Sequence, residues 1–249
     1  FPPMNVRLPV MLAIASTPFN ADAADWLIAP YGWLPAISVD QSSENSGGGG
    51  GVSGSDLLDK TESVFMLRFE AARNHWGLTA DYITLDLADQ STLSARPPLN
   101  LALDIEGELD LDVIEIGGFY RPSGEVAGVN YLLGLRQIGA DKRIVAIPSI
   151  GSAQVFENDA SVTDVFLGAR YVHRAGNRWD FTLRGDYSFG DSEGTLNLLA
   201  SVGLRVAGPF GLQLGYRHAV IEYEDSIDGV PETTEVSLSG GFLGFVFRF

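Results

Sequence analysis

The last seven residues of the chain alternate between large apolar side chains and other types. Positions 243, 245, 247 and 249 carry Leu, Phe, Phe and Phe, and Arg248 lies between the last two. Because successive side chains of a β-strand point to opposite faces, this pattern predicts a strand with one apolar face. Chain ends are usually frayed and hydrated, so a terminal strand with a phenylalanine face favours apolar surroundings.

Alternation of this kind recurs from residue 26 onward, and no apolar stripe follows the 3.6-residue period of a helix. The clearest strand segments are 129–135, 165–171, 179–189 and 195–206. No uncharged apolar run approaches the roughly 20 residues that a membrane-spanning helix needs. This excludes a helical membrane protein and leaves a β-barrel, whose strands alternate.

Composition excludes several functions. The chain of 249 residues has no cysteine, so it forms neither disulfides nor cysteine-bound metal sites. Its formal net charge is -16, which argues against nucleic acid as a partner because phosphate binding needs clustered Lys and Arg.

Residues 1–23 are predicted to be a signal peptide, with residues 1–3 of unclear origin. Arg7 provides a positive start, residues 8–16 an apolar stretch, and Ala21-Asp22-Ala23 a cleavage site between small residues.

Short and long connections alternate along the rest of the chain. The short ones lie at 73–75, 122–125, 175–177 and 208–209, and they contain residues that favour tight turns. The longer, more polar ones lie near 40–62, 88–107, 141–160, 190–194 and 222–234. The five glycines at 47–51 predict a flexible tether. Four short turns and five longer loops imply about ten strands.

We therefore predict an all-β fold: a transmembrane, antiparallel, up-and-down β-barrel of about ten strands, with 8 or 12 as alternatives. Residues 24–249 would form this single domain. A closed barrel has no edge strand where a proline escapes hydrogen bonding. Pro30 and Pro35 therefore predict a bulge, or a strand that begins after Pro30.

Three places break the apolar alternation of the predicted strands. The parity changes within 78–87, at 113–114 and around Gly240-Gly241. We expect a β-bulge at each of them, because one extra residue turns the following side chains to the opposite face.

The terminal strand resembles the last strand of bacterial outer-membrane β-barrels, in which a final Phe after alternating apolar residues is the assembly signal. Segments 26–33 and 69–78 are similar to uncharacterised proteobacterial barrels of the porin-like and OmpA- or OmpW-like superfamily. The resemblance implies an integral protein of the Gram-negative outer membrane. Its implied partners are outer-membrane lipid and, through the C-terminal strand, the barrel-assembly machinery.

Aromatic residues gather near the predicted short turns, as at a membrane–water interface. The candidates for this girdle are Trp76, Tyr120, Tyr171, Trp179, Phe210, Phe247 and Phe249. Tyr187, Phe189 and Tyr223 are candidates for an upper girdle. The alternative is a soluble β-sandwich, which leaves the signal peptide and the terminal pattern without a reason.

The face opposite the apolar one carries charges of both signs. The residues predicted to line the bore are Arg68, Glu70, Arg136, Asp164, Arg170, Asp180, Arg184, Asp186, Arg205, Arg217 and Arg248. Asp81, Asp110, Asp112 and Glu115 are assigned to the same face. Such charges must be hydrated or paired. They either form an ion-pair network that fills the bore or line a narrow polar pore.

The predicted long loops are acidic. Residues 40–62 contain five acidic side chains and one lysine, and residues 222–235 contain six acidic side chains and no base. A negative mouth attracts cations, so divalent cations at these loops are an expected partner. The spacing is not that of an EF-hand loop, and we expect no specific metal site.

No catalytic pattern is recognisable. His75 and His173 lie beside short turns, and His218 lies within a strand with no serine or paired acid near it in the chain. We therefore expect no enzyme and no cofactor. The leading hypothesis is a porin-like channel for ions or small hydrophilic solutes. The alternatives are a closed barrel with a structural or surface-interaction role and, more weakly, an outer-membrane hydrolase.

Overall fold

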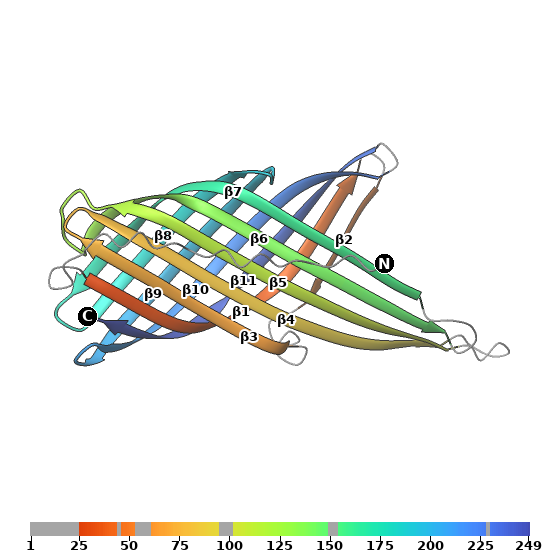
Figure 1. Ribbon diagram of the computed structural model, residues 1–249, viewed down its shortest axis with the longest axis horizontal. Coiled ribbons are helices and arrows are strands. Elements are labelled where there is room, and N and C mark those ends of the chain that lie inside the picture. The colour runs from red at the N-terminus through yellow and green to blue at the C-terminus, as the bar shows by residue number, and fades with distance from the viewer. Residues whose placement is uncertain (1–24, 44–45, 53–60, 95–101, 149–153, 228–229) are drawn as a thin grey trace, which may run out of the picture.

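The structure, a computed structural model, is built from β-strands (Figure 1). It describes residues 25–43, 46–52, 61–94, 102–148, 154–227 and 230–249, and the predicted signal peptide lies outside them. The described part has no helix, and so none that could cross a membrane. The strands are β1 (Asp25–Ser43), β2 (Ser46–Val52), β3 (Thr61–Arg73), β4 (Trp76–Ser94), β5 (Ala102–Tyr120), β6 (Gly128–Pro148), β7 (Gln154–Ala175), β8 (Trp179–Gly190), β9 (Gly194–Ala207), β10 (Phe210–Ile227) and β11 (Val230–Arg248).

Ten of these strands form a closed antiparallel barrel (Figure 1). From β3 to β11, each strand pairs with the next one along the chain. β1 closes the ring by pairing with β3 on one side and with β11 on the other. The short strand β2 pairs with residues 37–43, the C-terminal part of β1. The predicted all-β antiparallel barrel of about ten strands is therefore confirmed.

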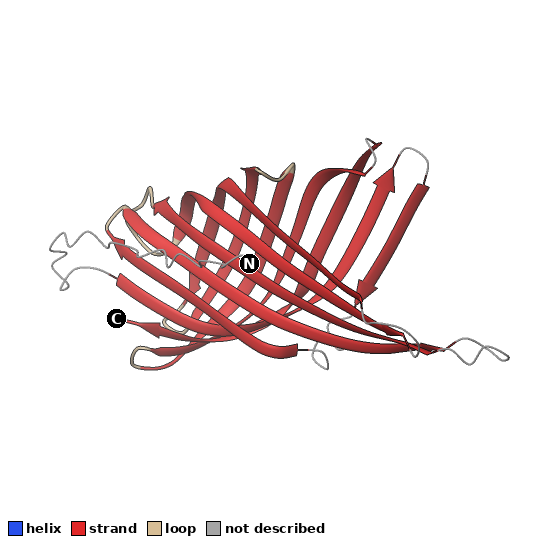
Figure 2. Ribbon diagram, turned by 45° about the vertical axis from the view of Figure 1, so that its right-hand side comes forward, coloured by secondary structure: helices blue, strands red, loops and turns tan. Residues whose placement is uncertain are grey.

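The four short turns lie where they were predicted, and Figure 2 shows the strands tilted along the barrel between its two ends. Each turn contains a residue with positive φ: Asn74 (53°), Gly124 (72°), Gly176 (63°) and Gly208 (52°). Glycine adopts this left-handed conformation without steric cost, and asparagine tolerates it. These turns define one end of the barrel, which we call the turn end; the opposite end is the loop end.

The prediction of long loops is wrong for most of the residues concerned. Strands cover 88–94, 102–107, 141–148, 154–160, 222–227 and 230–234. These polar stretches lack the sustained apolar alternation that identifies a strand in the sequence. Backbone hydrogen bonding needs no such alternation, and the ladders therefore continue.

The predicted glycine tether is also a strand. Residues 46–52 form β2, which pairs antiparallel with β1 from Ser43↔Ser46 to Ile37↔Val52. Each glycine has a backbone N–H donor and a C=O acceptor, and residues 37–43 of β1 provide the hydrogen-bond partners for them.

Both prolines of β1 lie within the strand, and neither ends it. Trp26 exchanges two backbone hydrogen bonds with Phe249, so even-numbered residues of β1 direct their bonds to β11. Pro30 falls in a gap of the β1–β11 register between Ile28 and Tyr31. Pro35 directs its nitrogen to the other side, where the described pairing with β3 has already stopped at Pro30. A locally unpaired edge thus accommodates each proline.

The breaks in apolar parity are not bulges. The pairing is continuous through 78–87, 113–114 and 240–241, and the register shifts lie elsewhere, at 61–63 and 210–211. At the three places apolar side chains instead point into the barrel. They belong to an interior apolar layer formed by Trp33, Met66, Ile83, Leu199, Ala219, Leu238 and Phe242.

Gly240 is the point of closest approach between β1 and β11. A Cβ atom there would lie 1.9 Å from the carbonyl oxygen of Leu34, while one at Gly241 would meet nothing nearer than 3.8 Å. The indole Nε1 of Trp33 donates a hydrogen bond of 3.2 Å to the Gly240 carbonyl at the same place.

We expect Gly240→Ala to lower the free energy of unfolding by about 1–3 kcal/mol, because the new methyl group separates the closing strands. Urea unfolding of the detergent-folded protein measures this, together with the gel-mobility shift on boiling that reports a closed barrel. Gly241→Ala is the matched control and should behave as the wild type. Equal stability of the two variants would contradict the close approach.

Candidate functional site

The eleven residues predicted to line the bore all point into it, in two groups. Toward the middle lie Arg136, Asp164, Arg184, Asp186 and Arg217, and toward the turn end lie Arg68, Glu70, Arg170, Asp180, Arg205 and Arg248. Alternation along each strand places them there, since the apolar neighbours of the same strands face outward.

The middle group, apart from Asp164, belongs to a central ion network of three bases and three acids. Its members are Arg136, Arg184, Arg217, Asp81, Glu115 and Asp186, and each is at most 9% exposed. The charges balance, as burial away from water requires.

Glu115 holds this network together. Its Oε1 accepts hydrogen bonds from Arg136 Nε at 3.0 Å and Arg217 Nη2 at 3.1 Å, and its Oε2 accepts one from Arg184 Nη2 at 2.8 Å. Glu115 lies on β5 and Arg217 on β10, which are five strands apart in a ring of ten. One carboxylate therefore connects opposite walls of the barrel.

Asp186 forms the second centre of the network. It accepts bonds from Arg184 Nε at 2.7 Å and from Asn197 Nδ2 at 2.8 Å, and Arg136 Nη2 lies 2.5 Å from its Oδ1. Arg136 Nη1 also donates to Ser188, whose hydroxyl donates to Asp164 at 3.0 Å. Arg136 thus donates through all three of its guanidinium nitrogens.

Apolar groups close the space on both sides of the network. Phe166 is fully buried, and the guanidinium carbons of Arg136 and Arg184 lie 5.3 and 5.6 Å from its ring centre. Ile83 and Ala219 of the interior apolar layer follow toward the loop end, while Leu199 of the same layer is the register partner of Arg217. Arg217 also lies 5.2 Å from the ring of Trp33. Ions and apolar packing together fill the middle of the bore.

Two acidic residues that were predicted inside the bore lie outside it. Asp110 and Asp112 are exposed on the outer wall, whereas Glu115 is buried inside. β5 keeps one register through this region, so odd positions face inward and even positions outward. The prediction was wrong because inward-facing Val113 is apolar and imitates a change of face.

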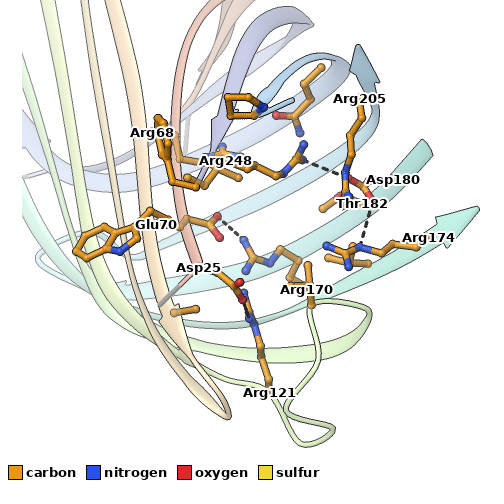
Figure 3. A pocket seen from close by; sticks show the side chains of 18 of the residues that line it. Asp25, Arg68, Glu70, Arg121, Arg170, Arg174, Asp180, Thr182, Arg205 and Arg248 are labelled. Carbon is orange, nitrogen blue, oxygen red and sulfur yellow. Dashed lines mark hydrogen bonds and ion pairs between the residues drawn. The ribbon is translucent and has the colours of Figure 1, made fainter. Parts of the chain in front are cut away.

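The turn end of the bore is hollow, in contrast to its middle. A cavity of about 440 Å³ opens there, lined by the N-terminal part of β1, the turn at Gly208 and the end of β11 (Figure 3). We call it the vestibule. Seven arginines and three acidic residues line it: Arg68, Arg121, Arg170, Arg174, Arg184, Arg205, Arg248, Asp25, Glu70 and Asp180.

Three of these arginines share one carboxylate. Asp180 lies 3.4 Å from Arg174 Nε, 3.3 Å from Arg248 Nη2 and 3.9 Å from Arg205 Nη2. Figure 3 shows the three guanidiniums approaching Asp180 from different strands. Only the contacts with Arg174 and Arg248 approach hydrogen-bond length, so Arg205 is held mainly by charge.

Four further charges of the vestibule form two separate pairs. Arg170 Nη1 lies 2.5 Å from Glu70 Oε1, and Arg121 Nη1 donates to Asp25 at 3.3 Å. The Nε atoms of Arg121 and Arg170 are buried without a hydrogen-bond partner. Burial and, after it, the positive charge of Arg170 lower the pKa of Arg121 from its ordinary value. Positive charge is therefore crowded in this cavity.

The predicted girdle residues lie around the turn end, and most of them face outward. Trp76, Tyr120, Tyr171, Trp179 and Phe249 are exposed, while Phe210 and Phe247 are partly buried. The rings of Trp76 and Tyr120 are 4.8 Å apart, and those of Phe210 and Phe247 are 5.7 Å apart. Tyr187 and Phe189 are exposed nearer the loop end; the side chain of Tyr223 lies outside the described residues.

The structure supplies a partner for His218 that the sequence analysis missed. Ser239 is its register partner on β11, and the serine Oγ lies 2.5 Å from His218 Nδ1. A carboxylate that would orient the imidazole does not occur among its described hydrogen-bond partners. The pair satisfies two polar groups on the outer wall. No spacing in the sequence reveals it, because strand pairing alone brings the two residues together.

A row of aspartates crosses the outer wall toward the loop end. Asp86, Asp110, Asp141 and Asp159 are direct register partners on β4, β5, β6 and β7. Like charges directly opposite each other destabilise a sheet.

Of the acidic residues predicted in the loops, Glu44, Asp56, Asp59 and Asp228 lie outside the described residues, as does Lys60. In the described chain no cluster of three or more His, Asp or Glu could hold a metal ion.

A closed antiparallel barrel with an apolar outer wall is the architecture of bacterial outer-membrane β-barrel proteins. The chain matches no protein-family model and no curated protein. Solved structures that it resembles include the translocator domain of the autotransporter NalP from Neisseria meningitidis, with 10% identity, coverage of 91% of this chain and 89% of that one, and a TM-score of 0.38.

Two further structures are similar to the chain. The attachment invasion locus protein Ail of Yersinia pestis is 10% identical over 88% of this chain and 99% of that one, with a TM-score of 0.35. The outer membrane protease OmpT from Escherichia coli is 10% identical over 92% and 97%, with a TM-score of 0.32. These are barrels with different roles, and no role passes from them to this chain.

We expect Glu115→Gln to lower the free energy of unfolding by about 3–5 kcal/mol, because it leaves three buried guanidiniums with too few acids. Glu108→Gln is the matched control on the same strand. Glu108 is exposed, its side chain 57% accessible, and its ion pair with Arg143 is worth about 0–1 kcal/mol. Urea unfolding in micelles compares the two, and equal losses would contradict the network's role.

We expect Asp110→Asn to raise the free energy of unfolding by about 0.2–1 kcal/mol, because Asp86 and Asp141 both face Asp110 directly. The gain should shrink in about 1 M salt, where exposed charges are screened over about 3 Å. Urea unfolding at low and high salt measures it. A stability loss at low salt would show that the row is held by compensating contacts.

Proposed function

We propose that this protein is an integral outer-membrane β-barrel that is closed across its middle and acts at its two ends. This is the closed-barrel hypothesis of the sequence analysis, and the geometry favours it over the porin-like channel. The single observation that carries it is the central ion network, in which Glu115 joins opposite walls of the bore.

Burial supports the closed state. The six charged members of the network are at most 9% exposed, which leaves little room for a continuous column of water among them. Passage of an ion would have to separate pairs at 2.7–3.1 Å whose charges have no alternative solvent. Breaking one such pair costs about 3–5 kcal/mol.

A second barrier supports the same reading. Ile83 and Ala219 of the interior apolar layer lie two residues nearer the loop end than Asp81 and Arg217 on the same strands, so a hydrated ion that passed the charges would next meet apolar side chains there. In a porin-like channel the polar lining continues along the bore. Here apolar side chains of β1, β3, β4, β10 and β11 line the bore beside the buried polar residues Asp164, Ser188 and Thr195 of β7 to β9.

We also propose that the protein has no enzymatic activity, and that its partners are outer-membrane lipid and the assembly machinery that receives β11. The odd-numbered face of β11 supports contact with lipid: Leu243, Phe245 and Phe249 are exposed, while Arg248 points into the vestibule. His218 and Ser239 form the arrangement closest to a hydrolytic site, and they lack an orienting acid among their described partners.

Planar-bilayer conductance tests the proposal. The wild-type protein, inserted at high load and verified as folded by its gel-mobility shift, should give no discrete conductance steps. Regular steps from the wild type would overturn the closed barrel and restore the porin-like channel.

A positive control shows that the assay would detect an open bore. Glu115→Ala combined with Arg136→Ala removes an acid and a base together and shortens two side chains that fill the middle. If this variant folds, it should conduct, and Glu108→Ala combined with Arg143→Ala, on the outer wall, should remain silent. Hydrolysis of lipid by the wild type that is lost in Ser239→Ala would overturn the absence of enzymatic activity.

A further inference from the structure

We propose that the vestibule at the turn end is a binding site for a small soluble polyanion that carries two or more phosphate or carboxylate groups. This inference goes beyond the closure of the bore, since the cavity would be present in an open barrel as well. It assigns a ligand class to the cavity of about 440 Å³ at this end.

The charge of the lining supports an anionic ligand. Arg68 and Arg184 already have acidic partners in the middle of the bore. The other five arginines that line the vestibule face only three acidic residues of that lining. This excess of positive charge occurs in a chain whose net charge is -16, so it is a local feature and not a consequence of composition.

The donors in the vestibule are incompletely used. A guanidinium has five N–H donors, and three guanidiniums converge on the single carboxylate of Asp180, with Arg205 3.9 Å away. The Nε atoms of Arg121 and Arg170 also lack a partner but are buried, so the donors within reach of a solute are those of Arg174, Arg205 and Arg248. An anion with several oxygens would satisfy donors that the protein leaves free.

Shape and access restrict the class of ligand. A cavity of about 440 Å³ is the size of a pocket for a small molecule. The barrel wall separates it from lipid, and it opens at the turn end, so the ligand arrives from water. The side chains of Arg174, Arg205 and Arg248 are 36%, 38% and 30% exposed and are accessible to a solute.

The chemistry of arginine specifies what the ligand carries. Guanidinium groups bind phosphate and carboxylate through two parallel hydrogen bonds, which single-atom anions cannot accept in the same way. Arginines from β7, β9 and β11 surround the space, so a ligand with two or more such groups can engage several strands at once.

Asp180 has a distinct part in this site. It occupies the guanidiniums that an anion would use, and it therefore competes with the ligand. Removing its charge should strengthen binding, whereas a purely structural Asp180 would produce no such gain.

Calorimetric titration of the folded full chain in non-ionic detergent with inorganic pyrophosphate tests the inference. We expect saturable binding of one pyrophosphate per barrel that weakens with rising salt, and much weaker binding of acetate. Arg205→Gln should weaken the affinity about tenfold, as expected for a lost hydrogen bond to a charged group. Arg143→Gln is the matched control at the loop end and should bind as the wild type does.

Asp180→Asn provides the opposing test. It should bind pyrophosphate several-fold more tightly than the wild type, and it keeps the assay informative if an arginine variant does not fold. Absence of saturable binding by the wild type would overturn the inference. So would equal weakening by Arg143→Gln, or an Asp180→Asn affinity that is unchanged or lower. Conductance and binding are separate measurements, so either proposal can fail without the other.

Discussion

The pairing of charges inside a narrow barrel is the constraint on which the rest of this structure depends. A ten-strand wall directs every second side chain inward, and many of these side chains are ionised. Water cannot solvate them all, so they must find one another across the bore. Glu115 meets this requirement for three arginines at once, from one wall to the opposite wall. The same contacts that neutralise the charges also fill the middle of the barrel.

Charge is balanced in the middle and unbalanced toward both ends. At the loop end, four aspartates face one another along the outer wall. At the turn end, arginines outnumber acids around the vestibule. The sheet tolerates both imbalances because water reaches these ends, and an accessible excess of charge is available for ligands of the opposite sign. Paired charges in the middle and accessible charges toward the ends are thus two features of one distribution of charge.

Much of the fold could be predicted from the sequence, and individual residues show where prediction stopped. The phenylalanines near residue 249 indicate the outward face, and Gly208 with its three counterparts marks the turns. Val113, however, imitates a change of face, so Asp110 and Asp112 were assigned to the wrong side. The glycines of β2 carry no side-chain pattern, and their strand is decided by the backbone of β1 alone. Ser239 is 21 residues from His218 and becomes its neighbour only through the pairing of β10 with β11.

The sequence by itself determined the class of fold, because alternation has a period of two residues and is local. It also determined which charges are available to the interior. Only the tertiary structure decided which of those charges meet, since partners such as Glu115 and Arg217 are 102 residues apart and come together through ring closure. It likewise decided that the middle is filled and the turn end is hollow. Whether the inward-facing charges pair across the bore or line a pore depends on packing in three dimensions, which no local pattern encodes.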